Sequence, residues 1–157
     1  MARQEMARER FRGFVELSGL DQPYISKVEE RRLLEQGMGQ FELGPDEARG
    51  IVLDVSQVHR IKLERDIDRR ILDTLIHDSG KKRKVGRRRF KRAVAHYNAM
   101  AGGALTDAEA RSLVKQVMES NQFRPKRGGL TFSRRWYKRA DKGNKQSMRL
   151  RLLSRNI

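Results

Sequence analysis

The chain contains no cysteine among its 157 residues. That absence excludes a disulfide framework and a thiolate zinc site, and nothing in the sequence points to an oxidising compartment. No run approaches the roughly 18 consecutive apolar residues that a membrane-spanning helix needs. The first residues, Met1–Glu5, lead into a charged helical pattern and not into the apolar region of a signal peptide. We therefore expect a soluble, cytoplasmic protein.

Signals for catalysis are also scarce. The histidines His59, His77 and His96 lie far apart in the sequence, and none has a second histidine or a carboxylate at the spacing of a metal or acid–base site. The chain has no glycine loop that could cradle a phosphate and no nucleophile elbow. The sequence therefore predicts a protein that is not an enzyme and that uses no cofactor and no metal.

Apolar residues are few for a chain of this length. Hydrophobic residues make up 37% and aromatic residues 6%, against 36% charged residues. Such a composition supports a packed core of about a hundred residues, which is less than the whole chain. We predict an all-α fold of five or six short helices: an N-terminal amphipathic helix at 1–19, a helical domain at 20–121 and a basic, partly extended tail at 122–157.

Positive charge is abundant, and it is confined to one half of the chain. Residues 1–80 hold 13 Lys/Arg and 16 Asp/Glu, whereas residues 81–157 hold 23 and 4, which gives the overall net charge of +16. Charge of this size favours phosphate-bearing polymers, because binding releases their counterions. An acidic protein or an anionic membrane surface would attract it as well.

The charge is densest between Lys81 and Arg92. Nine of these twelve residues are basic, namely Lys81, Lys82, Arg83, Lys84, Arg87, Arg88, Arg89, Lys91 and Arg92. The last five fall in the first turns of a predicted helix, where the helix dipole disfavours cations and where free backbone N–H groups would help to bind a phosphate. The pattern therefore indicates an anionic partner, with a plain solvated charge run as the alternative.

A second basic patch surrounds the only tryptophan. Its predicted binding residues are Arg134, Arg135, Trp136, Tyr137, Lys138 and Arg139. Aromatic rings among arginines can stack on unpaired bases, which contributes roughly 1–3 kcal/mol per base. The equally open alternative is that Trp136 and Phe132 anchor the tail to the helical core.

Hydrophobic periodicity predicts six helices, at about 2–18, 22–36, 45–58, 63–77, 87–100 and 106–120. Asp21 and Pro23 are expected to open the second helix, and Gly37 and Gly39 to end it. A short extended piece is expected at 40–43. Residues 124–129 are typical of a loop or linker, and the tail offers a further short helix near 133–140 and a docking segment at 148–153.

A pattern of thirteen residues occurs twice in the chain. Leu43–Val55 and Leu105–Val117 share the form L-x-x-x-E-A-R-x-(I/L)-V-x-x-V at an offset of 62, with six identical positions. A capped amphipathic helix can arrive at this pattern by chance. The alternative is a duplicated helix-loop-helix unit.

The stretch Asp78–Phe90 resembles the frame of an EF-hand loop between two helices, with Val85 at the hydrophobic eighth position. The resemblance implies architecture only. A calcium site needs several oxygen ligands, and of these the stretch retains Asp78 alone; the third, fifth, sixth and twelfth positions hold Gly80, Lys82, Arg83 and Arg89.

These observations predict a nucleic-acid-binding protein that contacts the phosphate backbone through the basic loop and tail, with little sequence specificity. No helix resembles one that reads base edges, so DNA and RNA both stay open as ligands. About six neutralised phosphates would give a log–log salt slope near −5 on duplex DNA. The main alternative is a helical adaptor that holds an acidic protein in a larger assembly, and a third is attachment to anionic lipid.

Overall fold

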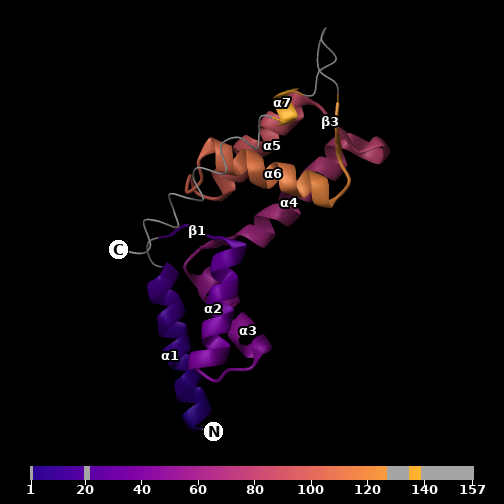
Figure 1. Cartoon of the computed structure of the whole chain (residues 1–157). Helices are drawn as coiled ribbons and strands as arrows, with labels where there is room; N and C mark the ends of the chain where they lie inside the picture. The colour runs from indigo at the N-terminus through magenta and orange to yellow at the C-terminus, as the bar shows by residue number, and fades with distance from the viewer. Residues whose placement is uncertain (1, 20–21, 127–134, 139–157) are drawn as a thin grey trace. The chain divides into compact units, whose positions relative to one another are not determined.

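The computed structural model describes residues 2–19, 22–126 and 135–138, and these are helical with a few very short strands. The chain forms two units, Met1–Asp66 and Ile67–Ile157. The elements that begin in unit 1 are α1 (Ala2–Gly19), β1 (Tyr24–Ile25), α2 (Lys27–Gln40), α3 (Pro45–Val58), β2 (Lys62–Leu63) and α4 (Glu64–Ser79), the last of which continues into unit 2 (Figure 1). The rest of unit 2 comprises the 3-10 turn η1 (Gly80–Lys82), β3 (Lys84–Val85), α5 (Arg87–Met100), α6 (Asp107–Ser120), β4 (Arg124–Pro125) and α7 (Arg135–Lys138). The predicted all-α class is confirmed.

The two units repeat one order of elements: a helix, a two-residue strand, two helices and a second strand. In each unit the two strands pair in parallel, β1 with β2 and β3 with β4. The chain also leaves α3 and α6 in the same way. Arg60 and Gln122 are both left-handed, with φ of 56° and 60°, and the next N–H returns to the helix over 2.8 Å, from Ile61 to Ser56 and from Phe123 to Met118. The thirteen-residue repeat is thus one helix of a larger repeated arrangement, which favours duplication over chance.

The core of unit 1 includes α1. Both α1 and α2 pack against α3, and Phe11 of α1 is fully buried, with its ring 5.3 Å from that of Phe41. Arg8 and Arg12 of α1 form ion pairs with Glu47 and Asp54 of α3. The chain therefore divides differently from the predicted boundary at residue 19, because the apolar side of α1 is buried within unit 1.

The Arg8–Glu47 pair also affects the titration of the Glu47 carboxyl group. The hydrogen bond from the Arg8 side chain, together with one from the Gly44 N–H, lowers the pKa of Glu47 below its ordinary value. Because the pKa of Glu47 is lower in the folded than in the unfolded state, the contact stabilises the fold at pH values above the ordinary pKa of a carboxyl group. That contribution is lost as the pH falls through the lowered pKa.

The second helix differs most from its prediction. Ser26, and not Asp21 or Pro23, is the N-cap, and the Glu29 carboxylate accepts the Ser26 N–H in a capping box. Tyr24 and Ile25 come earlier, as the strand β1.

The end of α2 also differs from its prediction. Gly37 and Gly39 lie inside α2, which runs to Gln40, so the extended piece predicted at 40–43 is absent. The apolar side chains of Val28 in α2 and Ile76 in α4 are exposed.

Unit 2 is built around α5 and α6, which pack against each other. Phe90, Val94 and Tyr97 of α5 are buried, and Thr106 and Glu109 form a capping box at the start of α6. The predicted boundary at residue 121 again differs from the structure, because Phe123 is buried and β4 pairs with β3. The short helix expected near 133–140 corresponds to α7, whereas 148–153 lies outside the described residues. Among the described residues, no helix combines the length and apolar character needed to cross a bilayer.

The packing of Gly37 yields a prediction. A Cβ atom at this position would lie 2.8 Å from Phe11 Cζ and 3.0 Å from Ala48 Cβ. We expect Gly37→Ala to lower the free energy of unfolding by about 1–3 kcal/mol, because overpacking a core costs that much. The matched control is Gly39→Ala in the same helix, where a Cβ meets nothing within 4 Å; it should stabilise by about 0.5–1 kcal/mol. Urea unfolding followed by circular dichroism compares the two, and equal effects would contradict this packing.

Candidate nucleic-acid interface

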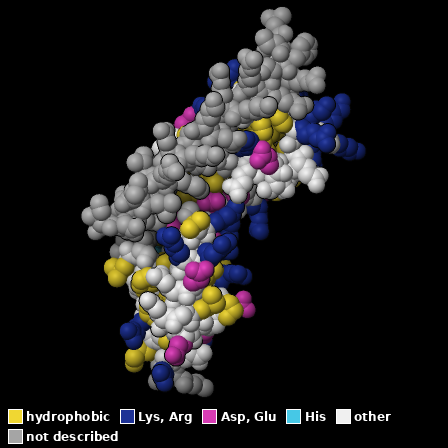
Figure 2. Space-filling view, viewed as in Figure 1, with side chains coloured by type: hydrophobic (Ala, Val, Ile, Leu, Met, Phe, Trp, Pro, Cys, Tyr) yellow, Lys and Arg dark blue, Asp and Glu magenta, His cyan; other side chains and the backbone are white. Residues whose placement is uncertain are grey.

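The basic stretch Lys81–Arg92 forms the turn between α4 and α5 and the first turns of α5. Gly80 and Arg83 adopt left-handed conformations, with φ of 56° and 42°, and the Arg83 N–H donates to the Gly80 carbonyl over 3.2 Å. This closes η1 within three residues and leads into β3, where Val85 is buried while Lys84 is exposed. In Figure 2 a group of Lys and Arg side chains lies at the right edge of unit 2, in the region of this turn.

Three of the nine predicted cations have structural roles. The Arg83 guanidinium donates to the Asn121 carbonyl over 2.9 Å and lies 5.7 Å from the centre of the Phe123 ring. Arg89 donates to the backbone carbonyl of Asp78, and Arg92 pairs with the Asp78 carboxylate over 3.1 Å. These contacts fasten the turn to the ends of α4 and α6, so we assign Arg83, Arg89 and Arg92 to the support of the site.

The other six predicted cations of the stretch are exposed and form no ion pair with any described residue: Lys81, Lys82, Lys84, Arg87, Arg88 and Lys91. The three on α5 are neighbours, since side chains three and four positions apart lie on one side of a helix. The side chains of Arg89 and Arg92 turn instead toward Asp78 at the end of α4.

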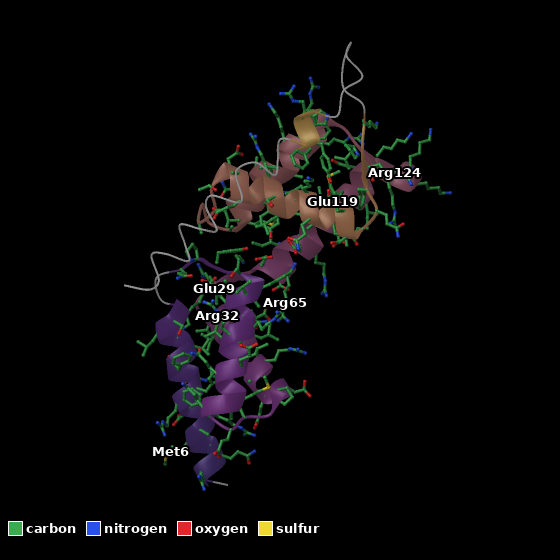
Figure 3. All side chains as sticks on the ribbon, viewed as in Figure 1. Met6, Glu29, Arg32, Arg65, Glu119 and Arg124 are labelled. Carbon is green, nitrogen blue, oxygen red and sulfur yellow. The ribbon has the colours of Figure 1, made fainter. Side chains whose placement is uncertain are left out.

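The strand β4 and the residue after it add two cations that are not among the individual binding residues predicted from the sequence. The N–H groups of Arg124 and Lys126 donate to the carbonyls of Arg83 and Val85, both over 2.8 Å, and Arg124 faces Lys84 in register. Both side chains are exposed, and Arg124 is labelled in Figure 3. The Lys126 side chain passes beside Gly86, the N-cap of α5. We call these eight side chains the cationic patch: Lys81, Lys82, Lys84, Arg87, Arg88, Lys91, Arg124 and Lys126.

The start of α5 lacks the acid found at the start of three other helices. In α2, α3 and α6 a glutamate at the third helical position, Glu29, Glu47 or Glu109, accepts the N–H of the N-cap residue. In α5 the N-cap is Gly86, which offers no side chain, and the third position holds Arg89. The positive end of this helix is therefore surrounded by cations, which is a favourable place for a phosphate oxygen.

Unit 2 has few acids that could neutralise the patch. It holds 25 Lys/Arg against 7 Asp/Glu, a net charge of +18, whereas unit 1 holds 11 against 13, a net charge of −2. Most of the described acids of unit 2 have partners outside the patch. Asp68 accepts the Tyr97 hydroxyl, Glu109 caps α6, and Asp78, Asp107 and Glu119 pair with Arg92, Arg111 and Lys115. These acids therefore do not neutralise the cations of the patch, whose side chains are exposed.

The two described side chains of the second predicted patch, Trp136 and Tyr137, form an anchor in this structure. The Trp136 and Tyr137 rings of α7 lie 5.3 Å and 6.0 Å from the Phe90 ring, and Tyr137 is buried. The Tyr137 hydroxyl donates to Glu119 over 3.3 Å, and Lys115 Nζ lies 5.0 Å from the centre of the Tyr137 ring. For Trp136 this contact corresponds to the anchoring alternative, whereas Phe132, the other predicted anchor, lies outside the described residues. The buried Tyr137 ring is not placed to stack on a base. Arg134 and Arg139 lie outside the described residues, as do the side chains of Arg135 and Lys138.

Metal-binding and acid–base groupings are sparse in the described part of the chain. It contains no group of three or more His, Asp or Glu side chains that could hold a metal ion. His59 has one acidic neighbour that its sequence position did not reveal, with Nε2 3.9 Å from Glu16 Oε1. This is a partly exposed pair between α1 and the end of α3, far in sequence from the cationic patch.

The aromatic anchor yields a second prediction. Phe90→Leu removes two ring–ring contacts, and because each such pair contributes about 0.5–1.5 kcal/mol, the variant should lose roughly 1–3 kcal/mol of stability. The emission of Trp136, the only tryptophan, should move to longer wavelength as its ring gains water. The control Tyr137→Phe keeps the ring and removes only the hydroxyl, so it should leave the emission in place. An unchanged emission in Phe90→Leu would contradict the contact.

Comparison of the chain with protein-family models, with curated proteins and with solved structures gives no match. The EF-hand-like frame of Asp78–Phe90 therefore stays a prediction about architecture. Its geometry here is a helix that ends at Ser79, a turn, and a helix that begins at Arg87.

Proposed function

We propose that this protein binds nucleic acid through the phosphate backbone, with little sequence preference, and that the cationic patch is the contact surface. One observation supports the proposal above all. Eight exposed cations, none paired with a described acid, lie on the turn after α4, the paired strands β3 and β4 with the residue after β4, and the uncapped first turns of α5, in a unit of net charge +18. Keeping like charges together is costly unless a partner of opposite charge neutralises them.

The side chains of the patch favour contacts with phosphates over contacts with bases. Five of the eight are lysines, which act as mobile point charges and lack the planar fork with which arginine grips a guanine edge. Contacts to phosphate fix the position of a protein on a nucleic acid without selecting its sequence. The expected binding is therefore strongly salt-dependent and weakly dependent on sequence.

A second candidate function is an adaptor whose basic unit holds an acidic protein. It is favoured by the apolar side chains that unit 1 exposes: Met6, Leu17, Val28, Met38 and Val58. Exposed apolar groups can contribute to a protein interface. A patch that binds an acidic protein would lack the steep and linear dependence of log affinity on log salt that counterion release from a nucleic acid produces.

A charge-removal variant tests the proposal. In the quadruple variant Lys84→Ala, Arg87→Ala, Arg88→Ala and Lys91→Ala, the supporting residues Arg83, Arg89 and Arg92 are untouched. If all four positions contact phosphates, affinity for random-sequence DNA and RNA should fall about 10³- to 10⁴-fold at 0.1 M salt, and the log–log salt slope should shrink by about 3 to 4. Fluorescence anisotropy across a salt series measures both quantities.

The matched control removes four exposed cations from unit 1: Arg10→Ala, Arg31→Ala, Arg32→Ala and Arg49→Ala (Arg32 is labelled in Figure 3). The net charge of the protein changes by the same amount, but the cationic patch stays whole. This variant should bind nearly as the parent does. Equal losses in the two variants would show that total charge matters and not the patch, and absence of binding by the parent at low salt would refute the proposal.

A further inference from the structure

We propose that the cationic patch binds double-stranded nucleic acid in preference to single strands. This inference rests on the proposed function and names the ligand class of the same surface. It follows from two features of unit 2, which are the positions of its aromatic rings and the fixed framework that carries its cations.

The described aromatic rings of unit 2 pack against other side chains of the protein. In the described part of unit 2, the rings of Phe90, Tyr97, Phe123 and Tyr137 are 0–8% exposed. Trp136 is partly exposed, yet its ring packs against Phe90 and Tyr137, and its indole N–H is buried without a hydrogen-bond partner among the described residues. The Phe123 ring lies beneath the Arg83 guanidinium.

Single-strand binding proteins depend on such rings. They combine a cationic groove with exposed aromatic side chains, on which successive bases stack. Here the ring of Tyr137 is inside the fold, and the ring of Trp136 has two aromatic neighbours already. Along the described patch, a single strand would gain charge neutralisation without a stacking platform.

A duplex gains more from the same cations. Its phosphates are denser along the axis, and for Z neutralised phosphates the salt slope is about −0.9Z for a duplex against about −0.7Z for a single strand. With about six phosphates neutralised, this difference alone favours the duplex by about tenfold at 0.1 M salt.

The cations are also held by a framework that suits a fixed array of phosphates. Lys84 and Arg124 face each other on paired strands, Lys126 is held by its backbone bond to Val85, and Arg87 and Lys91 are one turn apart on α5. The spacing of their backbones is thus set by secondary structure. A duplex presents phosphates at fixed positions to such a set, whereas a flexible single strand must be ordered at an entropic cost.

The test uses the full chain and labelled probes matched in number of phosphates: a DNA duplex, an RNA duplex, and single strands without self-structure, such as oligothymidylate. Anisotropy at 0.1 M salt should show at least one duplex bound about tenfold more tightly than the single strands. Trp136 emission should not be quenched by oligothymidylate, because no base stacks on its ring.

A variant separates the roles of the tryptophan. Trp136→Phe keeps an aromatic ring in the anchor and should leave duplex affinity within about twofold of the parent. Single strands bound as tightly as duplexes, with quenching of Trp136 in the parent, would overturn this inference and leave the proposed function standing. Failure of every probe to bind at low salt would overturn the proposed function itself, so the two failures are distinguishable.

Discussion

The pairing of β3 with β4 holds the candidate site together. Two backbone hydrogen bonds of 2.8 Å, from Arg124 and Lys126 to Arg83 and Val85, join the turn after α4 to the chain that leaves α6. The side chains of Val85 and Phe123 in these two segments are buried, and this burial stabilises the pairing against the repulsion among the exposed cations. The two segments would otherwise bring only like charges together. The surface therefore depends on a small apolar contact and two backbone bonds.

The same arrangement of elements serves two different chemistries. At the start of α2, Ser26 and Glu29 satisfy the free N–H groups and neutralise the positive end of the helix. At the equivalent start of α5, Gly86 and Arg89 leave that end open. The difference is a matter of a few side chains on a shared backbone plan. Architecture alone thus says little about ligands, and the side chains at a helix end decide what can bind there.

Local signals in the sequence predicted much of the fold and little of the tertiary contacts. The helices α3, α5 and α6 matched their expected ranges because each combines an apolar stripe with a clear start, such as Pro45 or Thr106. The predicted end of α2 was wrong because Gly37, a residue that often ends helices, lies inside α2, where the absence of a side chain allows close packing against Phe11. Strands of two residues have no periodicity to recognise. Arg124 belongs to the site because it pairs with Lys84, some forty residues earlier in the chain. The only sign of this pairing in the sequence is the offset of 62 between the repeats.

The crowding of unpaired cations at the open start of α5 has a consequence for the ionic medium. Mobile ions screen the repulsion among these side chains, so added electrolyte relaxes the strain that unit 2 carries when no partner is bound. The binding of a polyanion that we propose would weaken in the same electrolyte, because its ions compete with the protein for the polyanion. Added salt should therefore stabilise unit 2 in the absence of a partner and weaken the proposed binding, so the two effects of ionic strength have opposite signs.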